Sequence, residues 1–311
     1  MENPPPSGTA IAATVLKECA ALGLVPKEVY PGIIVTNGSF AKKVLGIDPS
    51  NFIQSLDVRV PVVGAEGTID PGALQWVTGE NANLHYRGNA LPRRKIWIQD
   101  GPTDENVLVY SYTGWMSTIA FATSDWNKDK ELTGINTKYN SFAKTCGFDV
   151  ANNDIITGYN DCDANIGYHY DKMRSLAMTG AIAVVKMGAP RRFCVRERLI
   201  PTRKLTKEEK VAHQKRQDMV PPLFDEVVES GALIFMTMEA NYLTQHAVPK
   251  MDSPVGLSGS MVFRTVDPKK YRKSVRVLTK AVAKLVADRA ARKTISKEKK
   301  PSVSRKKKKV M

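Results

Sequence analysis

Two histidines and one carboxylate form the most chemically suggestive set of side chains in this sequence. His169 and Asp171 stand two residues apart, and His246 follows 75 residues after Asp171. If the first pair lies on a strand, alternation places both side chains on the same face. Two histidines and a carboxylate are the donor set of a facial triad, which holds Fe(II) and leaves positions open for a cosubstrate and dioxygen. We therefore take these three residues as candidate iron ligands.

Short motifs surround these residues in a definite order along the chain. They are Leu91-Pro-Arg93, Tyr110-Ser-Tyr112-Thr-Gly114, the run from Tyr159 through Ile166-Gly167 to Asp171, Ser230-Gly231-Ala-Leu-Ile-Phe-Met, His246-Ala-Val-Pro249 and Met261-Val-Phe-Arg264. In order and spacing, this set resembles the AlkB family of Fe(II)- and 2-oxoglutarate-dependent dioxygenases. The resemblance covers about Leu91 to Thr265, a little over half of the chain.

The resemblance implies a role for each matching residue at the iron and the cosubstrate. His169, Asp171 and His246 match the family's iron ligands. Arg264 matches the arginine that pairs with a 2-oxoglutarate carboxylate, and a guanidinium suits that partner because it offers two parallel donors. Tyr159 matches the tyrosine that hydrogen-bonds the cosubstrate.

On the substrate side, the resemblance implies that Tyr110 and Tyr112 line a pocket for a flipped nucleobase. Their alternation with Ser111 is equally the pattern of strand residues that pack in a core. Arg93 belongs to the motif that lies on the nucleic-acid side of the family fold, and Lys172 follows the candidate ligand pair directly.

The sequence departs from the family pattern at three places. Ser258 stands where the family has a second arginine, six residues before Arg264, and Thr157 replaces an asparagine expected two residues before Tyr159. We assign Ser258 and Thr157 to the cosubstrate site by position. Lys172 and Met173 replace the acidic residues that help to read a damaged base.

The activity implied is oxidative dealkylation of alkylated nucleobases in DNA or RNA, with Fe(II), 2-oxoglutarate and dioxygen. Hydroxylation of an N-methyl group releases formaldehyde and the unmethylated nitrogen. Two alternatives stay open. Lys172 and Met173 favour a dioxygenase of the same fold that hydroxylates or demethylates protein or a small molecule. Ser258 favours a non-catalytic nucleic-acid-binding protein on a degenerate dioxygenase scaffold.

Positive charge is concentrated at the C-terminal end. Residues 269–311 hold 18 Lys and Arg against two acids, whereas the other 268 residues hold 28 against 29. A basic run lies near the end, formed by Arg305, Lys306, Lys307, Lys308 and Lys309. Such a run predicts an arm for nucleic-acid phosphates or a nuclear import receptor. We therefore expect a monomer located in the nucleus.

The composition excludes several protein classes. Apolar residues make up 42% and charged residues 25%, as in soluble globular proteins and unlike collagen-like, wholly disordered or disulfide-scaffold chains. The longest apolar runs fall well short of the roughly 20 residues needed to cross a bilayer, and the N-terminus lacks a secretory pattern. The widely spaced Cys19, Cys146, Cys162 and Cys194 argue against a zinc site or disulfides and predict a reducing intracellular compartment.

The elements that must position these side chains are mainly short strands. Strand-like runs recur at 155–159, 181–187, 192–197, 231–237 and 260–266, joined by Gly, Pro and Asn. This pattern favours a β-sandwich or jelly roll over a βαβ sheet. Together with the resemblance, it predicts a mainly β, α+β fold with a double-stranded β-helix (jelly-roll) core and flanking helices.

Along the chain, we expect a disordered N-terminus (1–9), an N-terminal extension that packs on the core (10–90) and the dioxygenase domain (91–266). A basic amphipathic helix (267–292) and a disordered Lys-rich tail (293–311) follow. Within the extension, a helix is expected over 10–23 and strands within 30–63. Two strands are expected within 96–112, and a helix around 140–146. The charged insertion 205–219 begins with capping-box spacing from Thr206 to Glu209, which predicts an exposed helix.

Overall fold

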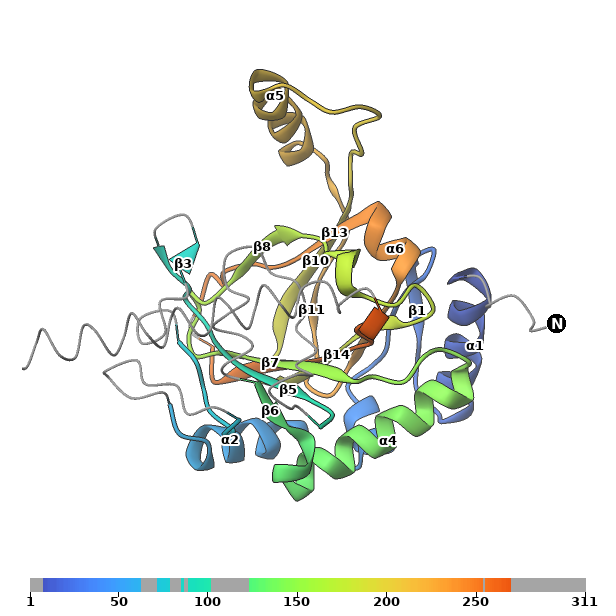
Figure 1. Cartoon of the computed structure of the whole chain (residues 1–311), viewed down its shortest axis with the longest axis vertical. Coiled ribbons are helices and arrows are strands. Elements are labelled where there is room, and N and C mark those ends of the chain that lie inside the picture. Colours follow the sequence, from blue (N-terminus) through green and yellow to red (C-terminus); the bar gives the residue numbers. More distant parts are fainter. Residues whose placement is uncertain are drawn as a thin grey trace, which may run out of the picture.

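The fold consists of two facing β-sheets, with helices covering the outer face of the larger sheet (Figure 1). The computed structural model describes residues 8–62, 72–78, 85–86, 89–101, 123–253 and 255–269. Across the described part of the larger sheet, the strands are β1 (Lys27–Tyr30), β2 (Ile33–Val35), β12 (Leu233–Thr237), β9 (Ala181–Gly188), β14 (Ser258–Arg264), β7 (Asn153–Tyr159), β5 (Arg94–Gln99) and β6 (Thr123–Asp125).

The smaller sheet has the order β11 (Pro222–Val228), β10 (Arg191–Glu197), β13 (Thr244–Val248) and β8 (Ile166–His169) among the described residues. Neighbouring strands in both sheets are antiparallel, apart from the parallel pair β5 and β6. β3 (His85–Tyr86) and β4 (Asn89–Ala90) pair separately. The arrangement confirms the predicted jelly-roll core.

Helical segments complete the described chain, and none is long and apolar enough to span a bilayer. They are α1 (Gly8–Ala21), the short π-helix η1 (Ala41–Leu45), α2 (Pro49–Arg59), the 3-10 turns η2 (Trp126–Lys128) and η3 (Met173–Ser175), α4 (Lys130–Cys146), α5 (Lys207–Asp218) and α6 (Met238–Leu243). The N-terminal extension (10–90), which was expected to pack on the core, also supplies β1 and β2, the last two strands at one edge of the larger sheet.

Alternation along the central strands divides the core into two layers. Ile156, Met261 and Val185 point towards helices α1, α2 and α4 and belong to the cluster on that side. Their neighbours Ile155 and Val262 point towards the smaller sheet instead and belong to a second cluster. Successive strand residues face opposite sides, so each buried strand contributes to both layers. Side chains of this second layer, such as Ile155 and Val262, line a cavity between the two sheets.

Several elements differ from the sequence expectations. The run at 58–63 was expected as a strand, but α2 extends through Val58 to Arg59, and beyond it Val62 makes one bridge to Trp76. Asp48 caps this helix and Pro49 occupies its first turn, a start signal that the β-branched residues concealed. α4 begins at Lys130, ten residues earlier than the expected helix around 140–146. The expected strand at 105–112 and the helix after Lys269 lie outside the described residues.

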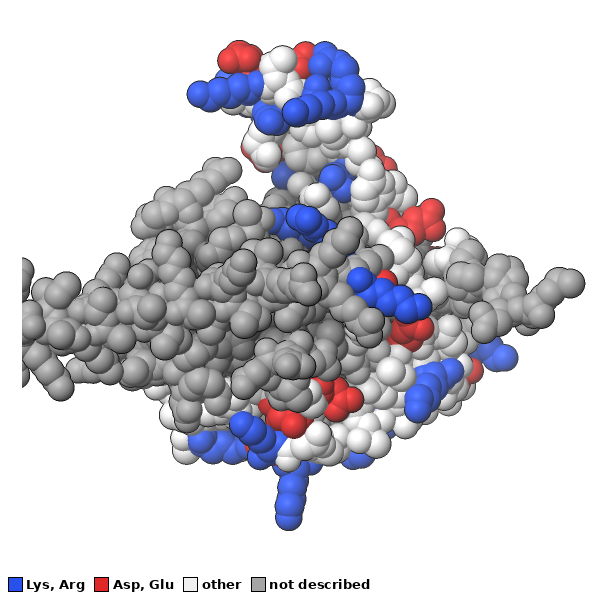
Figure 2. All heavy atoms as spheres, in the orientation of Figure 1, with Lys and Arg blue, Asp and Glu red and all other residues white. Residues whose placement is uncertain are grey.

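The charged insertion forms α5, as predicted. The Thr206 side chain accepts from the backbone of Glu209, and the Glu209 side chain accepts from the backbone of Thr206, completing the capping box. Figure 1 shows α5 standing away from the two sheets, between β10 and β11. Lysine and arginine side chains gather on this arm in Figure 2. Gln217, which bonds to the backbone of Leu199 and Glu197, anchors its base.

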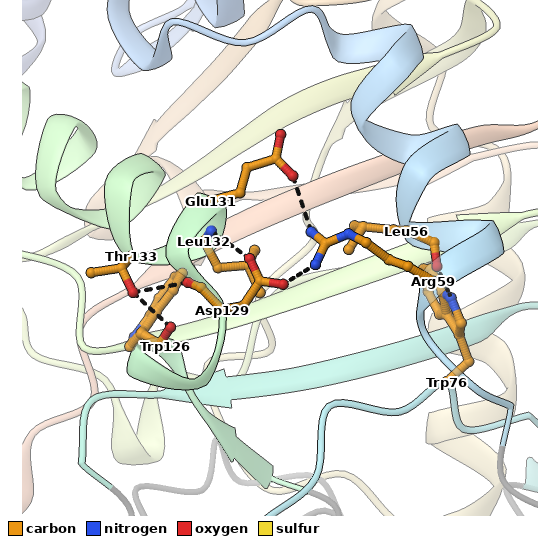
Figure 3. A network of polar contacts seen from close by, with 8 residues as sticks. All are labelled: Leu56, Arg59, Trp76, Trp126, Asp129, Glu131, Leu132 and Thr133. Carbon is orange, nitrogen blue, oxygen red and sulfur yellow. Dashed lines mark hydrogen bonds and ion pairs between the residues drawn. The ribbon is translucent and has the colours of Figure 1, made fainter.

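A polar network joins α2 to the start of α4 (Figure 3). Arg59 at the end of α2 pairs with Asp129 and with Glu131, the latter at 3.0 Å. Asp129 also caps α4, because its Oδ1 accepts from the backbone of Leu132 at 3.0 Å. Trp76 Nε1 donates to the carbonyl of Leu56 at 3.1 Å. These contacts hold α2, the start of α4 and the segment around Trp76 together.

Replacement of the capping residue tests this arrangement. Asp129→Ala removes both the helix cap and an ion-pair partner. We expect the free energy of unfolding to fall by about 1–2 kcal/mol, mostly from the lost cap. Denaturant titration measures the loss. The control Glu131→Ala removes a half-exposed partner of the same arginine and should cost less than about 0.5 kcal/mol. Equal losses in the two variants would contradict the capping role.

Candidate metal centre and cavity

The three candidate ligands lie together at one end of the space between the sheets. His169 ends β8 and His246 lies opposite it on β13, with ring centroids 4.3 Å apart. Asp171 follows β8 by two residues, and its Oδ1 lies 3.9 Å from His169 Nε2. One donor atom from each of the three residues lies within 4.8 Å of the others. The fold therefore brings the three predicted donor residues close enough to share one metal ion.

Contacts on both faces of β8 orient this end of the strand. His169 Nδ1 lies 2.9 Å from the carbonyl of Gly167, which favours a proton on Nδ1 and directs Nε2 towards Asp171. Tyr168 and Tyr170 flank the histidine, and their rings carry the guanidinium groups of Arg196 at 3.9 Å and Arg198 at 3.7 Å. Alternation thus separates the metal-facing side chains from this outer stack.

Asn241 on α6 clamps the backbone of Asp171. Its Oδ1 accepts from the Asp171 N–H at 2.8 Å, and its Nδ2 donates to the Asp171 carbonyl at 2.8 Å. Asn241 is completely buried. Because α6 leads directly into β13, one short helix positions Asp171 by hydrogen bonds and His246 by chain connection.

Arg264 fixes the side chain of Asp171. Its Nε and Nη2 lie 2.8 and 2.6 Å from Asp171 Oδ2, which leaves Oδ1 on the side of His169. Burial alone would raise the pKa of Asp171, but Arg264 and the two histidines outweigh it and hold that pKa at about 2. The carboxylate is therefore ionised, as a metal ligand requires.

His246 has the features of a buried ligand. Its side chain is nearly inaccessible, and within the described residues its Nδ1 is a buried atom without a hydrogen-bond partner. Burial and the nearby His169 lower the pKa of His246 to about 3. The ring is thus neutral, which is the form that coordinates metals. Burial also lowers the pKa of His169 below its ordinary value, so this ring is neutral as well. Two neutral imidazoles and an ionised carboxylate suit Fe(II).

A cavity extends from these ligands between the sheets. It is lined by apolar side chains from the second core layer, and by a set of buried polar and basic side chains. The polar and basic lining residues are Lys95, Thr157, Tyr159, Lys186, Arg191, Ser260 and Arg264. Asp171 is the acidic residue in the described lining, and it is already paired with Arg264. The described cavity lining therefore holds more basic than acidic groups, and burial lowers the pKa of Lys95 and of Lys186 well below the usual range.

The predicted cosubstrate residues lie in or beside this cavity. Tyr159, Thr157 and Arg264 line it. Ser258 is completely buried and does not line it, but its Oγ accepts from Lys186 Nζ at 2.5 Å. The hydroxyl of Thr157 accepts from Lys95 Nζ at 3.2 Å.

Of the predicted substrate residues, Arg93 and Lys172 fall within the described part of the chain, and neither lines the cavity. Arg93 donates to the carbonyl of Asn165 at 2.7 Å and does not line the cavity. Lys172 is exposed, and Met173 packs against the second core layer. Tyr110, Tyr112 and the basic run 305–309 lie outside the described residues.

Sequence reasoning missed four residues that shape the site: Lys95, Lys186, Arg191 and Asn241. Lys186 had a signal, since it is the only charged residue in the apolar run 181–187. Arg191, for which the sequence leaves a phosphate contact and a solvated position at a turn equally open, is buried and donates to the carbonyls of Asp161 and Ala164. Asn241 carried no signal, because its role depends on how α6 packs against the Asp171 backbone.

Comparison with known proteins gives little beyond this geometry. No protein-family model matches the chain, and no curated protein matches it. A solved structure described as "The structure of OsALKBH1" superposes with a TM-score of 0.41 and 14% sequence identity, over 78% of this chain and 100% of that one. The assignment of the site therefore rests on the residues described above.

Asn241 offers a test of the metal centre that leaves all three ligands in place. Asn241→Ala removes both bonds to the Asp171 backbone, whereas Asn241→Asp keeps an acceptor for the N–H. We expect the affinity for Mn(II), measured by calorimetry, to fall about 10- to 100-fold in the alanine variant and less in the aspartate variant. If both folded variants bind Mn(II) as tightly as the native chain, the clamp does not support the metal centre.

Proposed function

We propose that this protein is an Fe(II)- and 2-oxoglutarate-dependent dioxygenase that dealkylates nucleobases. The observation that carries the proposal is the His169, Asp171 and His246 cluster at the end of a cavity whose described lining holds more basic than acidic groups. A bound Fe(II) would activate dioxygen and transfer single electrons, and no side chain can provide this chemistry. The chain's own part is to hold the metal, bind the cosubstrate and exclude water.

The charge of the cavity supports an anionic cosubstrate. Four buried basic side chains and one exposed arginine, Arg192, line it together with a single carboxylate, and a bound divalent metal would add to that surplus. 2-Oxoglutarate brings two negative charges and a 2-oxo acid group that can chelate a metal. Arg264 and Tyr159 are placed to receive its oxygens, since both line the cavity and both can donate hydrogen bonds.

Apolar side chains separate the polar groups and restrict water. Ile155, Val184 and Val262 form an apolar row across three neighbouring strands, and Phe193 faces them from the smaller sheet. In such surroundings the attraction between a carboxylate and a buried cation is stronger than in water. The His169 side chain is 37% exposed, whereas that of Asp171 is 2% exposed. A substrate therefore has access from the side of His169.

The overall reaction balances as follows. One atom of dioxygen enters the 2-oxo acid, which loses carbon dioxide and becomes succinate. The other atom hydroxylates the N-methyl carbon of the substrate. The carbon–nitrogen bond of that hydroxymethyl group then breaks, which releases formaldehyde and leaves a proton on the nitrogen. The residues described here position the reactants for this exchange.

A nucleic-acid substrate is supported by the family resemblance of the sequence and by its charge distribution. Residues 269–311 carry 18 basic and two acidic side chains, and α5 adds further lysines on an exposed arm. Such segments bind phosphates without reading the bases. Nuclear localisation and binding to an import receptor stay predictions from the basic run 305–309.

Lys172 keeps one alternative open, a dioxygenase of the same fold that acts on protein or a small molecule. This residue is exposed directly after the Asp171 ligand, where a basic group suits an acidic peptide as well as a phosphate. Met173, which had also favoured this alternative, is partly buried and packs against the second core layer.

Turnover of the cosubstrate tests the enzyme class. The native chain, reconstituted with Fe(II) under nitrogen and then exposed to air, should release succinate from 2-oxoglutarate. His169→Ala removes one metal ligand and should lower that release at least about 100-fold. His213→Ala changes a half-buried histidine on α5, outside the described cavity lining, and should leave the rate unchanged. Absence of succinate from folded, iron-loaded native protein would contradict the proposal.

Product analysis tests the substrate class. Single- and double-stranded DNA and RNA oligonucleotides with N-methylated bases, and methylated peptides of matched net charge, are incubated with the iron-loaded enzyme. We expect formaldehyde and unmethylated base in equal amounts from an oligonucleotide, and a rate that falls steeply with added salt. Demethylation or hydroxylation of the peptides, with none of the oligonucleotides, would favour the alternative instead.

A further inference from the structure

Lys186 is a buried base on a strand that is otherwise apolar. It lies on β9 with 6% of its surface exposed. Its Nζ donates to the carbonyl of Met187 at 2.9 Å, to the carbonyl of Gly259 at 3.1 Å and to Ser258 Oγ at 2.5 Å. Three acceptors match the three N–H groups of an ammonium ion. These three bonds fix the position of the amine beside Ser258, at the border of the cavity.

No acidic partner accompanies that charge in the described part of the chain. All three acceptors of Lys186 are neutral oxygens, and its charged neighbour is another base, Arg191. Burial and Arg191 together lower the pKa of Lys186 well below its usual range. An anion brought into the cavity would reverse this effect, because opposite charge favours the protonated amine. An uncompensated buried cation is costly for the fold alone and useful for a ligand.

Strand register places Lys186 at one end of a polar row. Ser260 pairs with Lys186 on one side and with Thr157 on the other, and Thr157 pairs in turn with Lys95. Lys95 on β5 is at one end of this row, and Asp171 and Arg264 are among the charges that act on its pKa. Lys186 is at the opposite end, beside Ser258.

Ser258 identifies what Lys186 replaces. The family resemblance implies an arginine at position 258, and such an arginine would lie on the strand next to Lys186, since Ser258 pairs with Gly188 of β9. Ser258 is completely buried and its hydroxyl touches the lysine amine. An arginine side chain at position 258 and the lysine at 186 would compete for the same space. Relative to the family pattern, Ser258 and Lys186 together therefore take the place of the single arginine.

We propose that Lys186 binds the carboxylate of 2-oxoglutarate that is remote from the metal, and so makes the cavity selective for a dicarboxylate. This inference rests on the proposed function. It removes the reason to regard Ser258 as a sign of a degenerate, non-catalytic scaffold. Arg264 and the metal hold one end of the cosubstrate, and Lys186, with Tyr159 in the adjacent row of the sheet, holds the other.

Calorimetry with two ligands tests the inference without measuring activity. 2-Oxoglutarate and 2-oxobutyrate share the chelating group, but only the first has a remote carboxylate. Mn(II)-loaded native protein should bind 2-oxoglutarate more tightly. In Lys186→Met, the 2-oxoglutarate affinity should fall about 10- to 100-fold, whereas the 2-oxobutyrate affinity should not change. Lys144→Met, on the exposed side of α4, is the matched control and should bind both ligands as the native chain does.

Lys186→Gln provides a second variant that keeps hydrogen-bond donors for the local carbonyls and loses the charge. It should show the same selective loss of 2-oxoglutarate binding. Equal 2-oxoglutarate affinity in the native chain and in either folded variant would overturn the inference. Equal affinity of the native chain for 2-oxoglutarate and 2-oxobutyrate would also overturn the inference, and this measurement needs no variant. Failure of the native protein to bind Mn(II) or any 2-oxo acid is a different result, because it would overturn the proposed function itself.

Discussion

The buried ion pair between Arg264 and Asp171 joins the two sheets at the metal-binding end of the cavity. Arg264 ends β14 in the larger sheet, and Asp171 follows β8 in the smaller one. Both side chains are almost completely buried, so loss of either partner would leave an uncompensated charge, at a cost of about 3–5 kcal/mol. The pair also directs Asp171 Oδ1 towards His169. The geometry of the donor set thus depends on the same contact that links the two sheets at this end.

The remaining buried charges follow from that contact. With Asp171 committed to Arg264, the described cavity lining offers no carboxylate to Lys95, Lys186 or Arg191. Their hydrogen bonds go to hydroxyl groups and backbone carbonyls, which satisfy the donors without neutralising the charge. A fold that keeps bases in this state gains little stability from them. Their placement is explained if an anion binds in the cavity. A dicarboxylate can reach both Arg264 and Lys186, which the account assigns to its two ends.

Much of this could be predicted from the sequence where the signal is local. The apolar runs gave the strands, Thr206 and Glu209 gave the start of α5, and the spacing of His169, Asp171 and His246 gave the donor set. α2 was missed because Val58 and its β-branched neighbours suggested a strand, whereas packing of Phe52, Ile53 and Leu56 on the sheet stabilises a helix. Propensity is overridden here by tertiary burial.

Other parts of the site depend on contacts between distant segments. Lys186 meets Ser258 only because β9 and β14 are neighbours in a given register, and a shift by one residue would turn the lysine to the other face. Asn241 reaches the Asp171 backbone across 70 positions of the chain. Neither contact leaves a periodic pattern in the sequence. The charge of the cavity emerges only when strands from five parts of the chain are assembled.

The most direct test of the account is the position of a metal and a cosubstrate in crystals grown without oxygen with Mn(II) and 2-oxoglutarate. Anomalous scattering at the manganese edge locates the ion, and difference density locates the organic ligand. The account predicts one strong peak bounded by His169, Asp171 and His246, with the ligand extending from it to Lys186. A fully occupied metal elsewhere, or a ligand whose remote carboxylate does not approach Lys186, would contradict it.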